Sequence, residues 1–288
     1  MKLSLLPFFL IFTSLLSIAE PSVWRAEKAG FSYTLLGSIH AGKGSFYPLP
    51  NSATKAFESS HGLIVEADIL SNTAPILRES NFSAIQVLSN QKIEQLHAIL
   101  TNYSLNIDSY LQLPPWLLAM TLQLLQLPEV GLQVELGIDQ FFLQQAHQNS
   151  TPVHEFEGMD FQISLFQNLE QEGADLLIDT IEGWSESQQA LTCLVDAWQQ
   201  GDDGMLVQLL EQQQYNQQLA DLLIYKRNNQ WVNALVNNRF QLIKGEYLVV
   251  VGALHLVGNK GIISQLERNG FTVERLTPIG YSNCKVAL

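Results

Sequence analysis

The chain has 288 residues, of which 47% are hydrophobic and 15% are charged, so it can bury a sizeable core and lacks the composition of a disordered protein. Its formal net charge of −13 argues against binding to nucleic acid or to an anionic membrane surface. The length suits one α/β domain, or a domain that carries a large insert.

The first 19 residues are predicted to be a signal peptide. Lys2 supplies a short positive region, residues 3–18 carry no charge, and Ser17-Ile18-Ala19 ends in the small residue that a signal peptidase needs. This apolar run is too short for a comfortable membrane span, and no basic stop-transfer segment follows it. We therefore expect an exported protein, periplasmic or secreted, that spans residues 20–288 and keeps no stable membrane span; an uncleaved anchor is the lesser alternative.

An apolar segment near the start of this exported chain, residues 33–39, is predicted to be a strand that passes through Gly37 and reaches His40. Continuous runs of this kind suit strands that are buried on both faces, and glycine lets the chain turn sharply where a strand ends. A helical pattern over residues 52–59 and a second apolar strand over residues 63–66 follow. Such a strand–helix–strand unit predicts two parallel strands that are neighbours in one sheet.

The region from about residue 89 to residue 240 is predicted to be a large helical insert. Helical spacing of apolar residues covers residues 93–103, 116–127 and 138–148, and it continues from residue 161 to 240 with breaks at glycines. Residues 151–156 instead favour a short strand, which ends just before Glu157.

The strand–glycine–histidine pattern occurs again near the C-terminus, where residues 247–251 lead through Gly252 to His255. A helical pattern over residues 261–269 and a strand over residues 271–274 follow. We interpret the chain as two related strand–helix–strand halves, with chance similarity of the two units as the alternative. The predicted fold class is α/β, with a central mixed, largely parallel sheet built from the two halves and the helical insert between them.

His40 and His255 are the strongest candidate pair for a functional site. The carboxyl ends of parallel strands lie at one edge of the sheet, where open α/β folds place their ligands, and the strand that ends at Glu66 reaches the same edge. Two imidazoles and one carboxylate suit a divalent metal such as Zn, Mn, Co or Fe, and they leave room for a water whose pKa the metal lowers. The alternative is that each histidine caps the loop after its strand.

Other candidates are less decisive. Asp68 follows the strand that ends at Glu66 and could support the site, although the favoured interpretation is an ordinary solvated position at the end of the strand. Glu157 is the equivalent acid after the middle strand. Arg227 could stabilise an oxyanion, although its place in a helical pattern favours an ordinary surface position. Cys193 and Cys284 allow either one disulfide or two free thiols, because the sequence does not place them within bonding distance.

Several segments carry a pattern that extends over nearly the whole exported chain. They are residues 36–40, 47–50, 65–68, 135–139, 227–231 and 252–258, together with Glu157. In combination they resemble the TraB/GumN superfamily, and within it the GumN/YbaP-like branch. Ser38 stands where threonine is common in that pattern, which keeps the hydroxyl. The superfamily includes the Tiki proteins, metalloproteases that use two Gly-x-x-His motifs with a glutamate, and it is similar in fold to the ChaN and erythromycin-esterase-like proteins.

The resemblance implies an exported metal-dependent hydrolase that cleaves a peptide or amide bond in a peptide or small-molecule substrate. His40, Glu66 and His255 would hold a divalent ion such as Mn, Co or Zn. Glu66 or Glu157 would accept the proton of the attacking water, and Arg227 would stabilise the oxyanion. Two alternatives stay open: a non-catalytic module that binds a peptide signal in the same crevice, and a transferase or esterase that works there without metal.

Overall fold

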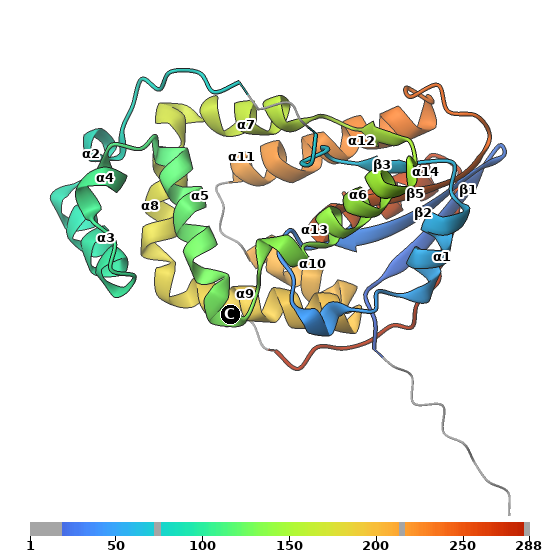
Figure 1. The fold of residues 1–288 in the computed structure, drawn as a ribbon, viewed down its shortest axis with the longest axis horizontal. Coiled ribbons are helices and arrows are strands. Elements are labelled where there is room, and N and C mark those ends of the chain that lie inside the picture. The colour runs from blue at the N-terminus through green and yellow to red at the C-terminus, as the bar shows by residue number, and fades with distance from the viewer. Residues whose placement is uncertain (1–18, 72–75, 213–216, 285–288) are drawn as a thin grey trace, which may run out of the picture.

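The computed structural model describes residues 19–71, 76–212 and 217–284, so the predicted signal peptide lies outside it except for its last residue. At its centre is a six-stranded sheet of order β4-β3-β5-β2-β1-β6 (Figure 1). The strands are β1 (Val23–Lys28), β2 (Phe31–Ser38), β3 (Leu63–Val65), β4 (Val153–Glu155), β5 (Gly245–Gly252) and β6 (Thr272–Arg275). Strands β4, β3, β5 and β2 pair in parallel, and β1 is antiparallel to both β2 and β6. The predicted α/β class with a mixed, largely parallel sheet is confirmed.

Both predicted strand–helix–strand halves form, but their strands interleave. The first half is β2, α1 (Asn51–Ser59) and β3; the second is β5, α14 (Ile262–Arg268) and β6. Strand β5 lies between β2 and β3, and strands β2 and β1 separate β5 from β6. The prediction that the strands of each half are neighbours is therefore wrong, because a crossover helix can carry the chain past a strand from the other half. This interleaving places the two Gly-x-x-His segments on adjacent strands.

Strand β1 was not predicted from the sequence. It joins β2 through a two-residue turn at Ala29 and Gly30, both with positive φ, of 54° and 90°. Turns with two left-handed residues match the twist of an antiparallel hairpin, so this Ala-Gly pair is the signal that could have revealed the strand. Through β1 the C-terminal strand β6 joins the sheet.

Helices cover the sheet and build a further layer beside it (Figure 1). The α-helices not yet introduced are α2 (Ala84–Val87), α3 (Asn90–Asn102), α4 (Ile107–Leu111), α5 (Pro115–Gln126), α6 (Ile138–Asn149), α7 (Met159–Gln167), α8 (Ala174–Glu182), α9 (Trp184–Gln200), α10 (Asp203–Gln212), α11 (Gln217–Ala220), α12 (Lys226–Val236) and α13 (Ala253–Leu256). Short 3-10 turns are η1 (Gly44–Phe46), η2 (Pro128–Val130), η3 (Val134–Leu136) and η4 (Glu170–Glu172), and a π-helical turn, η5 (Asp221–Tyr225), leads into α12. The three early helices predicted in the insert agree with α3, α5 and α6 to within a few residues.

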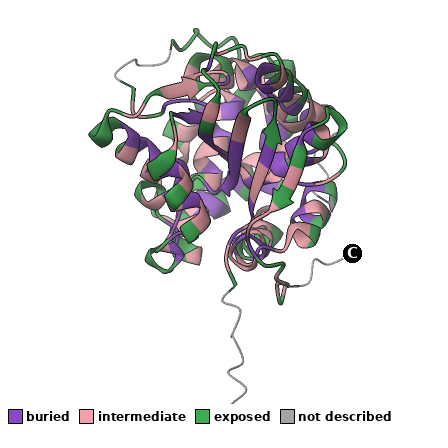
Figure 2. Ribbon diagram, turned by 90° about the vertical axis from the view of Figure 1, so that its right-hand side faces the viewer, coloured by how far each residue is buried: buried purple, intermediate pink, exposed green. Residues whose placement is uncertain are grey.

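Two apolar cores hold the molecule together. The larger lies on the sheet and includes Tyr33, Leu35 and Val249. Figure 2 shows strands in purple within the molecule, which agrees with the burial of most residues of β2, β3 and β5. The smaller lies among α2–α5 and α8 and includes Leu118 and Leu177. These five helices of the insert thus have a core of their own, whereas α6, α9, α10 and α12 contribute to the larger core. Among the described residues, no helix is both long and apolar enough to cross a bilayer.

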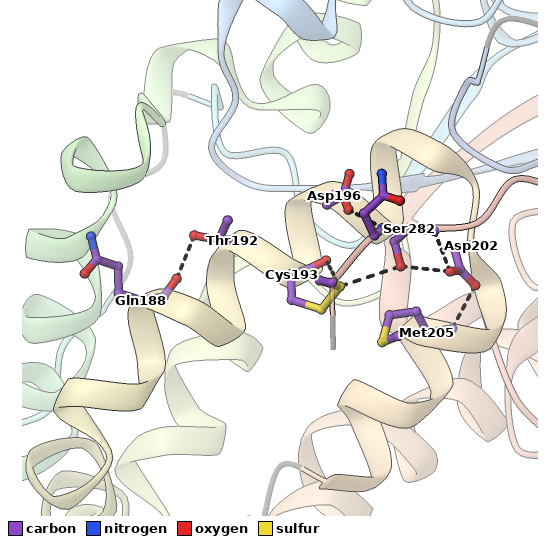
Figure 3. Close-up of a disulfide and its surroundings, with 9 residues drawn as sticks. Gln188, Thr192, Cys193, Asp196, Asp202, Met205 and Ser282 are labelled. Carbon is purple, nitrogen blue, oxygen red and sulfur yellow. Dashed lines mark hydrogen bonds between the residues drawn. A yellow bond between two sulfur atoms is a disulfide. The ribbon is translucent and has the colours of Figure 1, made fainter. Parts of the chain in front are cut away.

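A disulfide joins Cys193 of α9 to Cys284 near the C-terminus, with their Cα atoms 5.4 Å apart (Figure 3). Beside it, the carboxylate of Asp202 accepts hydrogen bonds from the backbone N–H and the hydroxyl of Ser282, each at 2.8 Å. Of the two alternatives that the sequence left open, the structure contains the disulfide. These bonds attach the C-terminal segment to the middle of α9 and to Asp202, just before α10.

Replacing Gly37 with alanine should destabilise the fold by about 1–3 kcal/mol, because overpacking in a rigid core costs this much. A Cβ at this position would lie 2.8 Å from the Cα of Ala253, where β2 passes under α13. Gly44 is the matched control, since a Cβ there meets no heavy atom within 4 Å. Urea unfolding of G37A and G44A measures both effects; equal stability of the two variants would contradict the close packing of β2 on α13.

Candidate functional site

The ends of three adjacent strands bring the expected site residues together around Gly252. In the β2–β5 register Ser38 lies opposite Gly252, so the chain segments that lead to His40 and His255 leave the sheet side by side. A Cβ built on Gly252 would lie 3.3 Å from Glu66 Oε1, 3.4 Å from His255 Cδ2 and 3.8 Å from His40 Nε2. The missing side chain of this glycine therefore leaves the space in which the three side chains meet, as the sequence predicted for His40, Glu66 and His255.

His40 is held by Asp139, which lies in the first turn of α6. Its Nδ1 is 2.7 Å from the carboxylate of Asp139, and the backbone N–H of Ile138 donates to the carbonyl of Ile39 at 3.0 Å, which fixes the start of α6 against the loop. The His40 side chain is 73% exposed. The charge of Asp139, together with this hydrogen bond, outweighs desolvation and raises the pKa of His40 to about 9. The sequence pattern Glu-x-Gly-Ile-Asp contained Asp139, but nothing in the pattern gave it a role.

His255 is held in the same manner by Asn228 of α12. Its Nδ1 is 2.6 Å from Asn228 Oδ1, while the amide nitrogen of Asn228 donates to the carbonyl of Lys260 at 3.0 Å. Because the amide oxygen faces the ring, Nδ1 carries the proton and Nε2 is the bare nitrogen. The ring is buried against Trp231, with centroids 4.4 Å apart. Burial lowers the pKa of His255 to about 3, so the ring is neutral.

Arg227 is the charged centre of the site rather than a surface residue. Its Nη2 lies 2.6 Å from Glu66 Oε2 and 2.9 Å from Glu157 Oε2, and its Nε donates to Glu157 Oε1 at 3.0 Å. The guanidinium also lies over the Trp231 ring, and Trp231 Nε1 donates to Glu157 at 2.8 Å. The surface position favoured by the helical pattern is wrong, because two carboxylates are buried at the strand ends and need a positive partner.

Glu66 is ionised and hydrogen-bonded at both oxygens. Its Oε1 accepts the backbone N–H of Gly252 at 2.7 Å, and its Oε2 accepts Gln162 Nε2 at 3.1 Å in addition to Arg227. Burial favours the neutral acid, but the positive charges of Arg227 and His40 and the Gly252 N–H favour the anion, and the pKa falls to about 2. Gln162 belongs to this site although the sequence gave no sign of it.

Two other acids occupy different places. Glu157 faces Arg227 and Trp231, and its carboxylate is almost completely buried, so it lies behind the arginine rather than in the open part of the site. Asp68 is buried and contacts His147 Nε2 at 2.9 Å, and it accepts the backbone N–H of Leu70. The solvated strand end favoured for Asp68 is therefore wrong, because His147 of α6 contacts its carboxylate.

The site contains the types of side chain that bind a divalent metal, but these side chains are not placed around one point where an ion could bind. His40 and His255 are both held through Nδ1, which is how metal-binding histidines are commonly oriented. However, Arg227 Nη1 lies 3.3 Å from the bare Nε2 of His255. Within residues 19–71, 76–212 and 217–284, no three His, Cys, Asp or Glu side chains are placed so that they could together hold a metal ion. The described arrangement thus fits a metal in donor chemistry but not in geometry.

The fold and the paired Gly-x-x-His segments define the class of protein. The profile of the TraB/PrgY/gumN family matches residues 22–275, and the chain belongs to this family. It is 32% identical over 241 residues to the uncharacterized protein YbaP of Escherichia coli strain K12, a match that covers 82% of this chain and 88% of that protein. It is 33% identical over 239 residues to the YbaP protein of Shigella flexneri, which covers 81% and 87% respectively. No solved structure matches the chain significantly.

Replacing Arg227 with methionine should cost about 3–5 kcal/mol of folding stability, because it leaves two buried carboxylates without a partner. The triple variant R227M/E66Q/E157Q should recover part of this loss, since the glutamines bury no charge. Arg268 on α14 is exposed and serves as the control, with an expected effect below about 0.5 kcal/mol for R268M. Denaturant unfolding in the presence of a chelator gives the values, and an R227M cost as small as that of R268M would refute the pairing.

The His40–Asp139 pair should stabilise the fold in a defined range of pH. Because the pKa of His40 rises from its ordinary 6.5 to about 9, its contribution is fully present below pH 6.5 and is lost as the pH rises through about 9. In D139N the pKa should return towards 6.5, so the stability difference between D139N and the wild type should shrink over this range. NMR titration of the His40 ring and unfolding at several pH values test this; an unchanged His40 pKa in D139N would contradict it.

Proposed function

We propose that this protein is an exported metal-dependent hydrolase that cleaves a peptide or amide bond, with His40, Glu66 and His255 at its reaction centre. The observation that carries the proposal is the orientation of the two imidazoles. Each is fixed through Nδ1 by a partner of its own, and each lies beside Glu66 at the space left by Gly252. The disulfide between Cys193 and Cys284 supports export, because disulfides persist in oxidising compartments.

The charge states of these side chains support a need for metal. A good general base has a pKa near the working pH. Glu66, with a pKa of about 2, and His255, with a pKa of about 3, are too weakly basic, and His40, with a pKa of about 9, is already protonated at neutral pH. A divalent metal, when bound, removes the need for such a base, since it lowers the pKa of a coordinated water to near neutrality. Its binding requires that His40 lose its proton and that Arg227 move away from His255 Nε2.

The residues around the centre have separable roles in this proposal. Asp139 and Asn228 orient the imidazoles, so they are positioning residues. The low pKa of Glu66 favours a role as an anionic ligand over a role as a base. Arg227 supplies a positive charge where negative charge develops on the carbonyl oxygen of the substrate, and Glu157 holds the guanidinium through two hydrogen bonds. Glu157 is thus assigned to position Arg227, and not to accept the proton of water.

A peptide-binding module without turnover is the second candidate. It is favoured by the incomplete metal geometry, since Arg227 already neutralises the carboxylates of the centre. A peptide library incubated with the protein and Mn²⁺, Co²⁺ or Zn²⁺ separates the candidates. Cleavage that a chelator abolishes supports the metal-dependent hydrolase, and saturable binding of intact peptide supports the module. Cleavage that survives chelation indicates an enzyme that uses this site without metal.

Removing either histidine should abolish metal binding, and removing both should add little, because ligands of one ion act as a unit. We expect H40A, H255A and the double variant to lose the ion, while H97A on the exposed face of α3 keeps it. Metal content by mass spectrometry, beside melting temperatures, measures the effect. Full occupancy in either single variant would refute the shared site. E66Q then separates two roles, since loss of a ligand empties the site whereas loss of a base leaves metal bound without turnover.

A further inference from the structure

A cavity of about 470 Å³ lies beside the reaction centre, between two parts of the helical region. One wall runs from the end of α7 through η4 to the start of α8, and the other runs from α11 through the π-helical turn η5 to the start of α12. Figure 1 shows α7 crossing from the sheet to α8 above α11. A volume of this size accommodates a side chain with part of a peptide backbone.

Each wall of the cavity is joined along the chain to a residue that contacts the reaction centre. On α7, Gln162 bonds to Glu66, and Asn168 at the end of the same helix lines the cavity. Asn168 comes six positions after Gln162, which corresponds to about 9 Å at a rise of about 1.5 Å per residue. On the other wall, Leu222 lines the cavity, and the carbonyl of the next residue, Leu223, accepts a hydrogen bond from Arg227. An extended peptide spans about 9 Å with about three residues, so a bound chain can reach from one place to the other.

The lining combines carboxylates with an apolar surface. Among the lining residues that the structure describes, Glu170, Asp175 and Asp221 contribute three negative charges and Lys226 one positive charge, which gives a formal charge of −2. Asp221 has only a loose contact with Lys260, 3.9 Å away, and among the described residues neither Glu170 nor Asp175 belongs to an ion pair. The start of α8 by itself favours anions, but Asp175 lies in its first turn and offsets that preference.

We propose that this cavity binds the arginine or lysine side chain of a peptide substrate, about three residues from the bond that is cleaved. The aliphatic stem of such a side chain packs on Leu176 and Leu222, and its charged end faces Glu170 and Asp175. The inference rests on the proposed function, because it names the substrate class of the same enzyme. It adds a specificity site outside the cluster of His40, Glu66 and His255.

A matched pair of blocked hexapeptides tests the cavity, one with a central arginine and the other with citrulline at that position. Citrulline keeps the length and the hydrogen-bonding head but carries no charge. Titration of the complete chain, followed by NMR, should show about tenfold tighter binding of the arginine peptide at low salt, the usual effect of one charge-assisted hydrogen bond. The preference should decrease as the ionic strength rises.

The double variant E170Q/D175N should bind the two peptides equally, whereas E94Q, on the exposed face of α3, should keep the preference. Circular dichroism and melting temperature confirm that the variants fold. Equal binding by the wild type, a preference that persists in E170Q/D175N, or tighter binding of a glutamate peptide would each overturn the proposal.

Turnover separates this inference from the proposed function. If the arginine preference depends on Glu170 and Asp175 but no peptide is cleaved with any metal, the cavity assignment stands and the hydrolase fails. If the arginine peptide is cleaved, and H40A abolishes cleavage while E170Q/D175N leaves the preference unchanged, the hydrolase stands and the cavity assignment fails.

Discussion

The site depends on one buried ionic arrangement, in which the guanidinium of Arg227 lies between the carboxylates of Glu66 and Glu157. Two buried carboxylates at neighbouring strand ends would repel each other and would lose their hydration. The guanidinium donates hydrogen bonds to both carboxylates. The Trp231 ring, which packs against the guanidinium, excludes water from one side. Helix α12, η5 and the ends of β3 and β4 are therefore fixed relative to one another by charge as well as by apolar packing.

Close approach of the backbone is the second constraint. Parallel pairing in register places the last residues of β2 beside those of β5, and Gly252 offers an N–H to Glu66 and no side chain to the space around it. Gly37 allows α13 to pack directly on β2. These two glycines let the segments that carry His40 and His255 leave the sheet side by side, because a Cβ would lie 2.8 Å from the Cα of Ala253 at Gly37 and 3.3 Å from Glu66 Oε1 at Gly252.

The helical region covers the sheet and also supplies residues of the reaction centre. Asp139 of α6 and Gln162 of α7 reach the strand ends from outside the two halves, and Asn228 and Arg227 come from α12. The reaction centre is thus assembled from the ends of β2, β3 and β5 and from three helices, α6, α7 and α12, that lie between β3 and β5 in sequence. The smaller core around Leu118 and Leu177 holds α5 and α8 beside this assembly, and the cavity lies where α8 approaches η5.

The sequence by itself determined the elements that local chemistry controls. The apolar runs of β2 and β5, the glycines near their ends and the helical spacing of α3, α5 and α6 depend on nearby residues, and they predicted the fold class and the meeting of His40, Glu66 and His255. The tertiary structure alone decided the interleaved strand order, the pairing of Cys193 with Cys284, the burial of Arg227 and the positions of Asp139, Asn228 and Gln162. The physical reason is that each of these features depends on a partner far away in the chain. The residues next to a side chain in sequence do not determine which distant charge or hydrogen-bond donor it contacts in the folded protein.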